Sequence, residues 1–63
     1  MNNTKQANNL NLDNAAIILG GADRRAGLPQ RTVTSLMAAI AAPELSAARE
    51  RAIVAAYARA FFA

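Results

Sequence analysis

Apolar residues along this chain recur at helical spacing, and no stretch alternates between apolar and polar positions as a strand does. The clearest apolar stripe follows the spacing i, i+3, i+4 and i+7, and consists of Val33, Leu36, Met37 and Ile40. The pattern predicts an all-α protein, a small domain of three or four helices that includes a helix-turn-helix and a long C-terminal helix.

Capping residues and helix breakers predict the ends of these helices, which we expect over residues 15–19, 22–26, 29–41 and 44–62. Asp13 or Asn14 is suited to cap the first helix, and the adjacent Gly20 and Gly21 are expected to stop or kink it. Gly27 is expected to end the second helix in a left-handed conformation. Proline is tolerated in the first turn of a helix, so position 29 opens the third.

Residues 1–11 are rich in asparagine and offer almost nothing to bury. We therefore expect them to form a polar flexible arm, with residues 12–63 as a single helical domain. Hydrophobic residues make up 54% of the chain, but seventeen of them are alanines, which bury little area. The core is expected to be thin, so that stability depends on close helix packing, on oligomerisation, or on both.

The expected C-terminal helix is apolar nearly all round beyond Arg51, which is typical of a helix buried on more than one side. Its alanines at positions 48, 52, 56 and 60 form a smooth ridge that another helix can approach closely. We expect the second buried side of this helix to be a homodimer interface, or alternatively a surface that binds another protein. The expected interface residues are Ile53, Tyr57, Phe61 and Phe62.

The formal net charge is +3, from seven Lys and Arg against four Asp and Glu, and six of the seven cations are arginines. The planar guanidinium group suits phosphate and guanine better than the lysine ammonium does. Charge therefore favours nucleic acid as a partner, to a modest degree.

The segment from Arg24 to Leu36 contains a turn glycine, Gly27, followed by Leu-Pro and then by a Thr-Val pair. It resembles the helix-turn-helix of bacterial transcription regulators, above all the isocitrate-lyase-regulator family. It is also similar to the lactose-repressor family, in which the recognition helix carries Thr-Val and is followed by a helix with Arg-Glu-Arg, as at positions 49–51 here. The resemblance implies a small bacterial or phage transcription regulator that binds double-stranded DNA.

By that resemblance, residues 29–41 form the recognition helix that enters the major groove. Leu28 is expected to fill the angle between the helices, with Val33 and Leu36 as core anchors. The expected DNA-binding residues are Arg24 and Arg25 on the phosphate backbone and Gln30, Arg31, Thr34 and Ser35 in the groove. Lys5 on the arm is a further candidate for a neighbouring groove. Asp23 stands where the family has a small apolar residue, so we expect its carboxylate to be exposed or paired with an arginine.

Two other functions are compatible with the residues. A small phage-type adaptor or inhibitor would cover a partner protein with the apolar C-terminal helix. Residues 10–21 resemble the leader of double-glycine secreted peptides, and cleavage after Gly21 would release a cationic helical peptide that can lie on anionic membranes.

Catalysis is not expected, because the chain has no His or Cys and its serines lack a base to activate them. No phosphate-binding loop, metal site or cofactor is expected either. No apolar run is long enough to cross a membrane, so no transmembrane segment is expected. The absence of cysteine is compatible with a cytoplasmic protein, which is the expected location.

Overall fold

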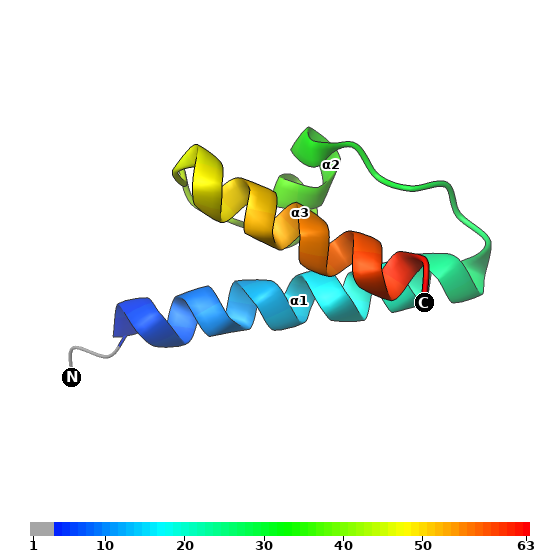
Figure 1. Cartoon of the computed structure of the whole chain (residues 1–63), viewed down its shortest axis with the longest axis horizontal. Helices are drawn as coiled ribbons and strands as arrows, with labels where there is room; N and C mark the ends of the chain where they lie inside the picture. Colours follow the sequence, from blue (N-terminus) through cyan, green and yellow to red (C-terminus); the bar gives the residue numbers. More distant parts are fainter. Residues whose placement is uncertain (1–3) are drawn as a thin grey trace.

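A computed structural model describes residues 4–63, with the side chains of the first helix described from Leu12 onward. The described residues form three α-helices, α1 (Thr4–Ala26), α2 (Val33–Ala39) and α3 (Ala47–Phe61), which together make up 71% of the chain. The described residues contain no strand, which confirms the all-α class. In Figure 1, α1 and α3 lie side by side and run in the same direction, so that both C-terminal ends meet at one end of the molecule. Residues 27–46, which include α2, run back along the pair and connect the end of α1 to the start of α3.

Helix α1 is longer than the sequence predicted, and it is continuous. It begins at Thr4, so the backbone of residues 4–11 belongs to the helix and not to a separate arm. The expected arm otherwise lies outside the described residues, as does the Lys5 side chain. The expected helices over residues 15–19 and 22–26 are joined through Gly20 and Gly21, and the prediction of a break there is wrong.

Gly20 explains why the helix continues. It is buried, and a Cβ atom built on it would lie 2.5 Å from the Tyr57 carbonyl oxygen and 3.1 Å from the Ala60 Cβ. The missing side chain therefore lets α3 approach the α1 backbone. Packing against α3 offsets the low intrinsic helix propensity of glycine, which is about 1 kcal/mol less favourable than alanine. Ala60 belongs to the alanine ridge that the sequence predicted.

Helices α1 and α2 end with the same hydrogen-bond pattern. At the end of α1, the Gly27 and Leu28 amides donate to the Arg24 and Asp23 carbonyls, at 3.1 and 2.9 Å. At the end of α2, residues 41 and 42 repeat these bonds to residues 38 and 37. Such a motif needs a left-handed residue after the helix. That residue is Gly27 in the first case, with φ +73°, which confirms the prediction, and Ala41 in the second, with φ 55°.

Helices α2 and α3 both begin later than predicted, because a hydroxyl side chain caps each of them. The Thr32 hydroxyl accepts the Ser35 amide at 3.1 Å, and the Ser46 hydroxyl accepts the Arg49 amide at 3.2 Å. Thr32 and Ser46 have extended backbones, so each helix starts at the following residue. The proline at 29 therefore lies in the connection and does not open α2.

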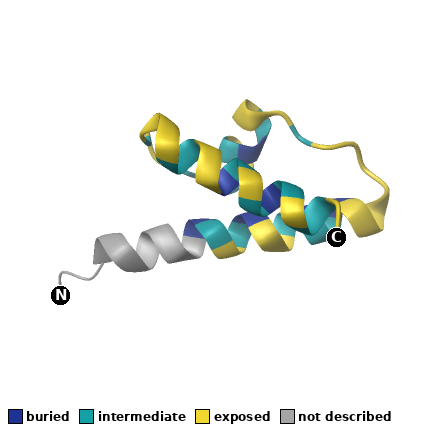
Figure 2. Cartoon of the chain, viewed as in Figure 1, coloured by how far each residue is buried: buried dark blue, intermediate teal, exposed yellow. Residues whose placement is uncertain are grey.

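The apolar core lies between α1 and α3, with one residue from α2. Its buried members are Leu12, Ala16, Leu36, Ile53 and Tyr57. Figure 2 shows how little else is buried, particularly along residues 27–34. Leu36 is buried as predicted, whereas Leu28 and Val33 are 48% and 43% exposed and do not anchor the core as expected.

Candidate functional site

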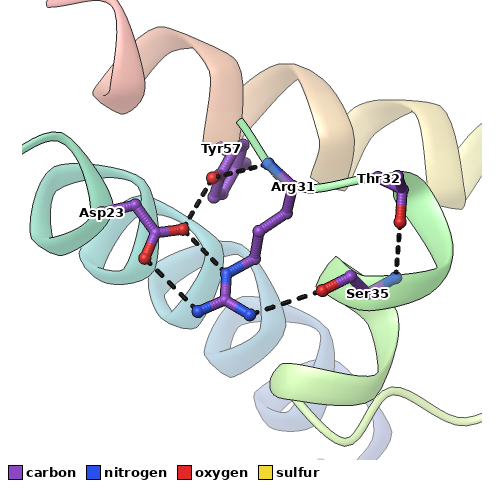
Figure 3. A network of polar contacts seen from close by, with 5 residues as sticks. All are labelled: Asp23, Arg31, Thr32, Ser35 and Tyr57. Carbon is purple, nitrogen blue, oxygen red and sulfur yellow. Dashed lines mark hydrogen bonds and ion pairs between the residues drawn. The ribbon is translucent and has the colours of Figure 1, made fainter. Parts of the chain in front are cut away.

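A buried carboxylate connects the three parts of the fold. Asp23, on α1, is only 3% exposed and accepts hydrogen bonds from two side chains. The Arg31 Nε lies 2.8 Å from its Oδ2, and the Tyr57 hydroxyl on α3 donates to the same oxygen at 2.7 Å. Figure 3 shows these groups converging, with the Ser35 hydroxyl on the far side of the guanidinium at 3.4 Å from Nη1. We refer to Asp23, Arg31, Ser35 and Tyr57 as the Asp23 cluster.

The electrostatics of the Asp23 cluster keep the carboxylate ionised. Hydrogen bonds from Arg31 and then from Tyr57 lower the pKa of Asp23, and they outweigh the opposing effect of burial. The bond to Asp23 raises the pKa of Arg31. Burial, followed by the bond to the carboxylate, raises the pKa of the Tyr57 phenol, which therefore remains protonated and able to donate. The expectation that Asp23 is either exposed or paired with an arginine is confirmed, since the ion pair is present.

The Asp23 cluster also fixes the path of the connection between α1 and α2. The Tyr57 hydroxyl accepts the backbone amide of Arg31 at 3.1 Å while it donates to Asp23. Arg31 is thus held to α1 through its side chain and to α3 through its main chain. An open surface hollow of about 310 Å³ lies beside this point, lined by Asp23 and Ser35 and by residues 28–32. The ionised carboxylate is already satisfied by donors, so the arrangement is suited to holding the connection in place.

Three of the six residues expected to contact DNA form side-chain hydrogen bonds to other residues of the chain. Arg31 and Ser35 belong to the Asp23 cluster. Arg24 donates from Nη1 to the Phe61 carbonyl oxygen at 3.0 Å and so caps the C-terminal end of α3. The remaining three, Arg25, Gln30 and Thr34, are exposed.

The expected recognition helix over residues 29–41 is reduced to the seven residues of α2. Gln30 and Arg31 precede it in extended connection, so they do not share a helix face with Thr34 and Ser35. The Thr32 cap and the bond between the Arg31 amide and Tyr57 both compete with helical backbone at these positions. The pattern predicted the burial of Leu36 correctly, but it placed the start of the helix four residues too early.

Charge is distributed unequally along the molecule. The end at which α1 and α3 terminate carries four arginines against one carboxylate, namely Arg24, Arg25, Arg31 and Arg59 against the buried Asp23. The opposite half carries Asp13, Glu44 and Glu50 against Arg49 and Arg51 among the described side chains. We refer to the first region as the basic end. Cations there also complement the negative ends of two parallel helix dipoles.

The residues expected at a dimer or partner interface are mostly part of the core. Ile53 and Tyr57 are buried within the single chain, so they are not available to a partner, and that part of the prediction is wrong. Phe61 is half-buried and stacks on Tyr57 with ring centroids 5.8 Å apart. Phe62 is 65% exposed and meets Phe61 edge to face. Of the four residues, Phe62 has the most accessible side chain.

Sequence reasoning missed two exposed apolar residues, Ile17 and Ile18, which are 46% and 67% exposed on α1. A continuous helix places Ala16 and Gly20 toward α3, and the two isoleucines then point outward. This could have been found on a helical wheel drawn through both glycines. The expected break at Gly20 concealed it.

Both glycines of the leader-like segment lie within α1, and Gly20 is buried against α3. A protease that cleaves after Gly21 would therefore need this part of the fold to open.

Among the described residues, no three side chains of the metal-binding types come together. The helices described also lack the combination of length and apolar character that a bilayer crossing requires.

Comparison with known proteins does not assign the chain to a family. Searches with protein-family models, among curated proteins and among solved structures find no match to this chain.

Proposed function

We propose that the protein is a small DNA-binding domain that contacts the phosphate backbone through its basic end. The observation that carries the proposal is the gathering of arginines at the end where α1 and α3 terminate, where the one carboxylate, Asp23, is already neutralised by Arg31. Phosphate contacts supply most of the sequence-independent affinity for DNA. Three of these arginines, Arg24, Arg25 and Arg59, are exposed.

The contact differs from that of the helix-turn-helix resemblance. Arg31 supports the fold through Asp23, and α2 has only seven residues, so the proposal does not depend on a helix lying deep in the major groove. Gln30, which lines the hollow beside Asp23, and Thr34 in the first turn of α2 are both exposed and are the candidates for contacts with base edges. A regulatory role at a specific site would rest on these two residues.

Fluorescence anisotropy of a labelled random-sequence duplex tests the proposal, at salt concentrations from about 50 to about 200 mM. We expect binding that weakens steeply as salt is added. Arg25→Ala should reduce the slope of log K against log salt by about 1, because one phosphate contact is lost. Arg51→Ala is the matched control, since it removes an exposed arginine from the opposite half.

Two results would contradict the proposal. One is the absence of binding at the lowest salt concentration. The other is an equal loss for Arg25→Ala and Arg51→Ala, which would show a response to net charge without a defined contact surface. Arg24 and Arg31 are unsuitable for this test because each also supports the fold.

A further inference from the structure

The outward surface of α1 is apolar at its centre. Asn14, Ile17, Ile18, Gly21 and Arg25 follow helical spacing along it, and all are exposed except Gly21, which is half-buried. We refer to these five residues as the α1 outer face. Its two isoleucines are adjacent, and next to them Gly21 has no side chain. The face thus has an apolar ridge at its centre, and Gly21 leaves the backbone accessible one turn further on.

An open hollow lies on each side of this ridge. One, of about 300 Å³, lies between α1 and the end of α2 and is lined only by apolar residues, namely Ala15, Ile18, Leu19, Ala22, Ala39 and Ile40. The other, of about 240 Å³, lies between α1 and α3 and is lined by Ile17, Ala56, Arg59 and Ala60. Each isoleucine therefore borders a different hollow, Ile18 on the α2 side and Ile17 on the α3 side.

We propose that the α1 outer face binds a second copy of this chain, with the two α1 helices antiparallel and the two-fold axis between Ile17 and Ile18. In a two-fold arrangement of this kind, the α2 side of one copy faces the α2 side of the other, and likewise for the α3 side. Ile18 of each copy then enters the hollow on the α2 side of its partner, and Ile17 enters the hollow on the α3 side. Each copy thus contributes the same ridge and the same two hollows to the interface.

The charges favour the antiparallel direction. About this axis, position 21 lies opposite position 14, and the basic end of one copy lies beside the opposite half of the other, where three carboxylates offset two arginines among the described side chains. The Arg25 guanidinium extends back toward Gly21, since its Nη1 is 3.4 Å from a Cβ built there. It therefore comes level with Asn14 of the second copy, whose side-chain amide oxygen can accept a hydrogen bond from the guanidinium. A parallel pair would instead bring the two basic ends together, and like charges there would oppose association.

Sedimentation equilibrium of the full chain tests the proposal, from about 5 to about 500 µM, because dimer formation depends on concentration. We expect twice the chain mass of 6.6 kDa in the upper part of this range. Ile18→Glu should raise the dimer dissociation constant more than about ten-fold, because it places a carboxylate in an apolar hollow of the partner. Phe62→Glu is the matched control, since Phe62 is similarly exposed but lies outside the α1 outer face. Circular dichroism should show unchanged helicity in both variants.

Cross-linking tests the direction, and the absence of cysteine in the chain makes single cysteine variants easy to interpret. A disulfide needs Cα atoms within about 7 Å. Ile18→Cys lies next to the axis and should form a covalent dimer on oxidation. Arg25→Cys should not, because the two copies of position 25 are then about 22 Å apart along the helices.

A chain that stays monomeric throughout the range overturns the proposal and leaves the α1 outer face to a different protein. Loss of the dimer in Phe62→Glu but not in Ile18→Glu overturns it in favour of the C-terminal end of α3. Efficient cross-linking through Arg25→Cys overturns the antiparallel direction. None of these readouts depends on DNA, and the contact of Arg25 with phosphate is measured in the monomeric Ile18→Glu background, so this proposal and the proposed function can fail separately.

Discussion

The α1–α3 pair and the connection from residue 27 to residue 46 are held in place by different means. Between α1 and α3, small residues allow two backbones to approach, and Gly20 meets the Tyr57 carbonyl where no side chain would fit. The connection has one buried apolar residue, Leu36, and a few partly buried apolar residues that pack against the core, and the polar contacts of Arg31 attach it further. Close backbone packing thus positions the pair, whereas the connection depends on a buried ion pair together with a few apolar side chains.

A chain with few bulky apolar residues can use one large side chain in both regions. Tyr57 takes part in both regions, because its ring lies in the core and its hydroxyl belongs to the Asp23 cluster. A tyrosine suits this position, since its apolar body and polar tip satisfy two environments at once. Variants in the two regions should therefore differ in size of effect and in their dependence on pH.

The largest effect on stability is expected for Gly20→Val, which forces α1 and α3 apart. Its Cβ would lie 2.5 Å from a main-chain oxygen, so the helices must separate. We expect a loss of at least about 3 kcal/mol in the free energy of unfolding, measured by urea denaturation. Gly21→Ala is the control. Its Cβ would meet only the flexible Arg25 guanidinium at 3.4 Å, and it should stabilise the helix by up to about 1 kcal/mol. Equal losses for the two variants would contradict the close approach at Gly20.

A smaller effect is expected for Tyr57→Phe, which keeps the ring in the core and removes the hydroxyl from the Asp23 cluster. One donor to a buried carboxylate is lost, and the main-chain amide of Arg31 loses its acceptor. We expect a loss of about 1.5–3 kcal/mol at neutral pH in the same denaturation measurement.

The pH dependence of this loss identifies its cause. The folded pKa of Asp23 is lowered, so its stabilising contribution is present above the ordinary aspartate pKa of about 3.9 and is lost as pH falls through the folded pKa. The difference between the wild-type protein and Tyr57→Phe should therefore narrow below about pH 4. A difference that stays constant from neutral to acid pH would show that the hydroxyl does not act through the carboxylate.

The smallest effect is expected at the two helix ends that share a left-handed residue. Ala41 has φ 55° at the position where α1 has Gly27. A left-handed conformation costs alanine roughly 1–2 kcal/mol, which glycine avoids. Ala41→Gly should therefore raise the thermal midpoint, while Gly27→Ala should lower it. Differential scanning calorimetry of both variants measures these opposite shifts, and shifts of the same sign would contradict the shared motif.

Local features of the fold could be predicted from the sequence wherever one residue has few alternatives. Gly27 ends α1 in a left-handed conformation, Leu36 is buried on the apolar stripe, and the carboxylate of Asp23 has an arginine partner. Each of these follows from the chemistry of one side chain and its neighbours in sequence.

Features that depend on distant residues could not be predicted. Gly20 is within a helix because α3 lies against it, and Arg31 is outside α2 because Tyr57 holds its amide. Local propensity gave the opposite expectation at both positions. The candidate DNA contacts changed for the same reason, since the partner of Arg31 lies on α1 and that of Arg24 lies on α3.

The parallel arrangement of α1 and α3 also determines the order in which the protein can fold. The polar contacts between these two helices join residues 34 to 37 positions apart, so they form only after a long stretch of chain has closed. Contacts this distant slow folding relative to a hairpin of neighbouring helices. During synthesis α1 lacks its contacts with α3 until residues 53–61 have left the ribosome. Until then its core residues are exposed to chaperones and proteases along with Ile17 and Ile18.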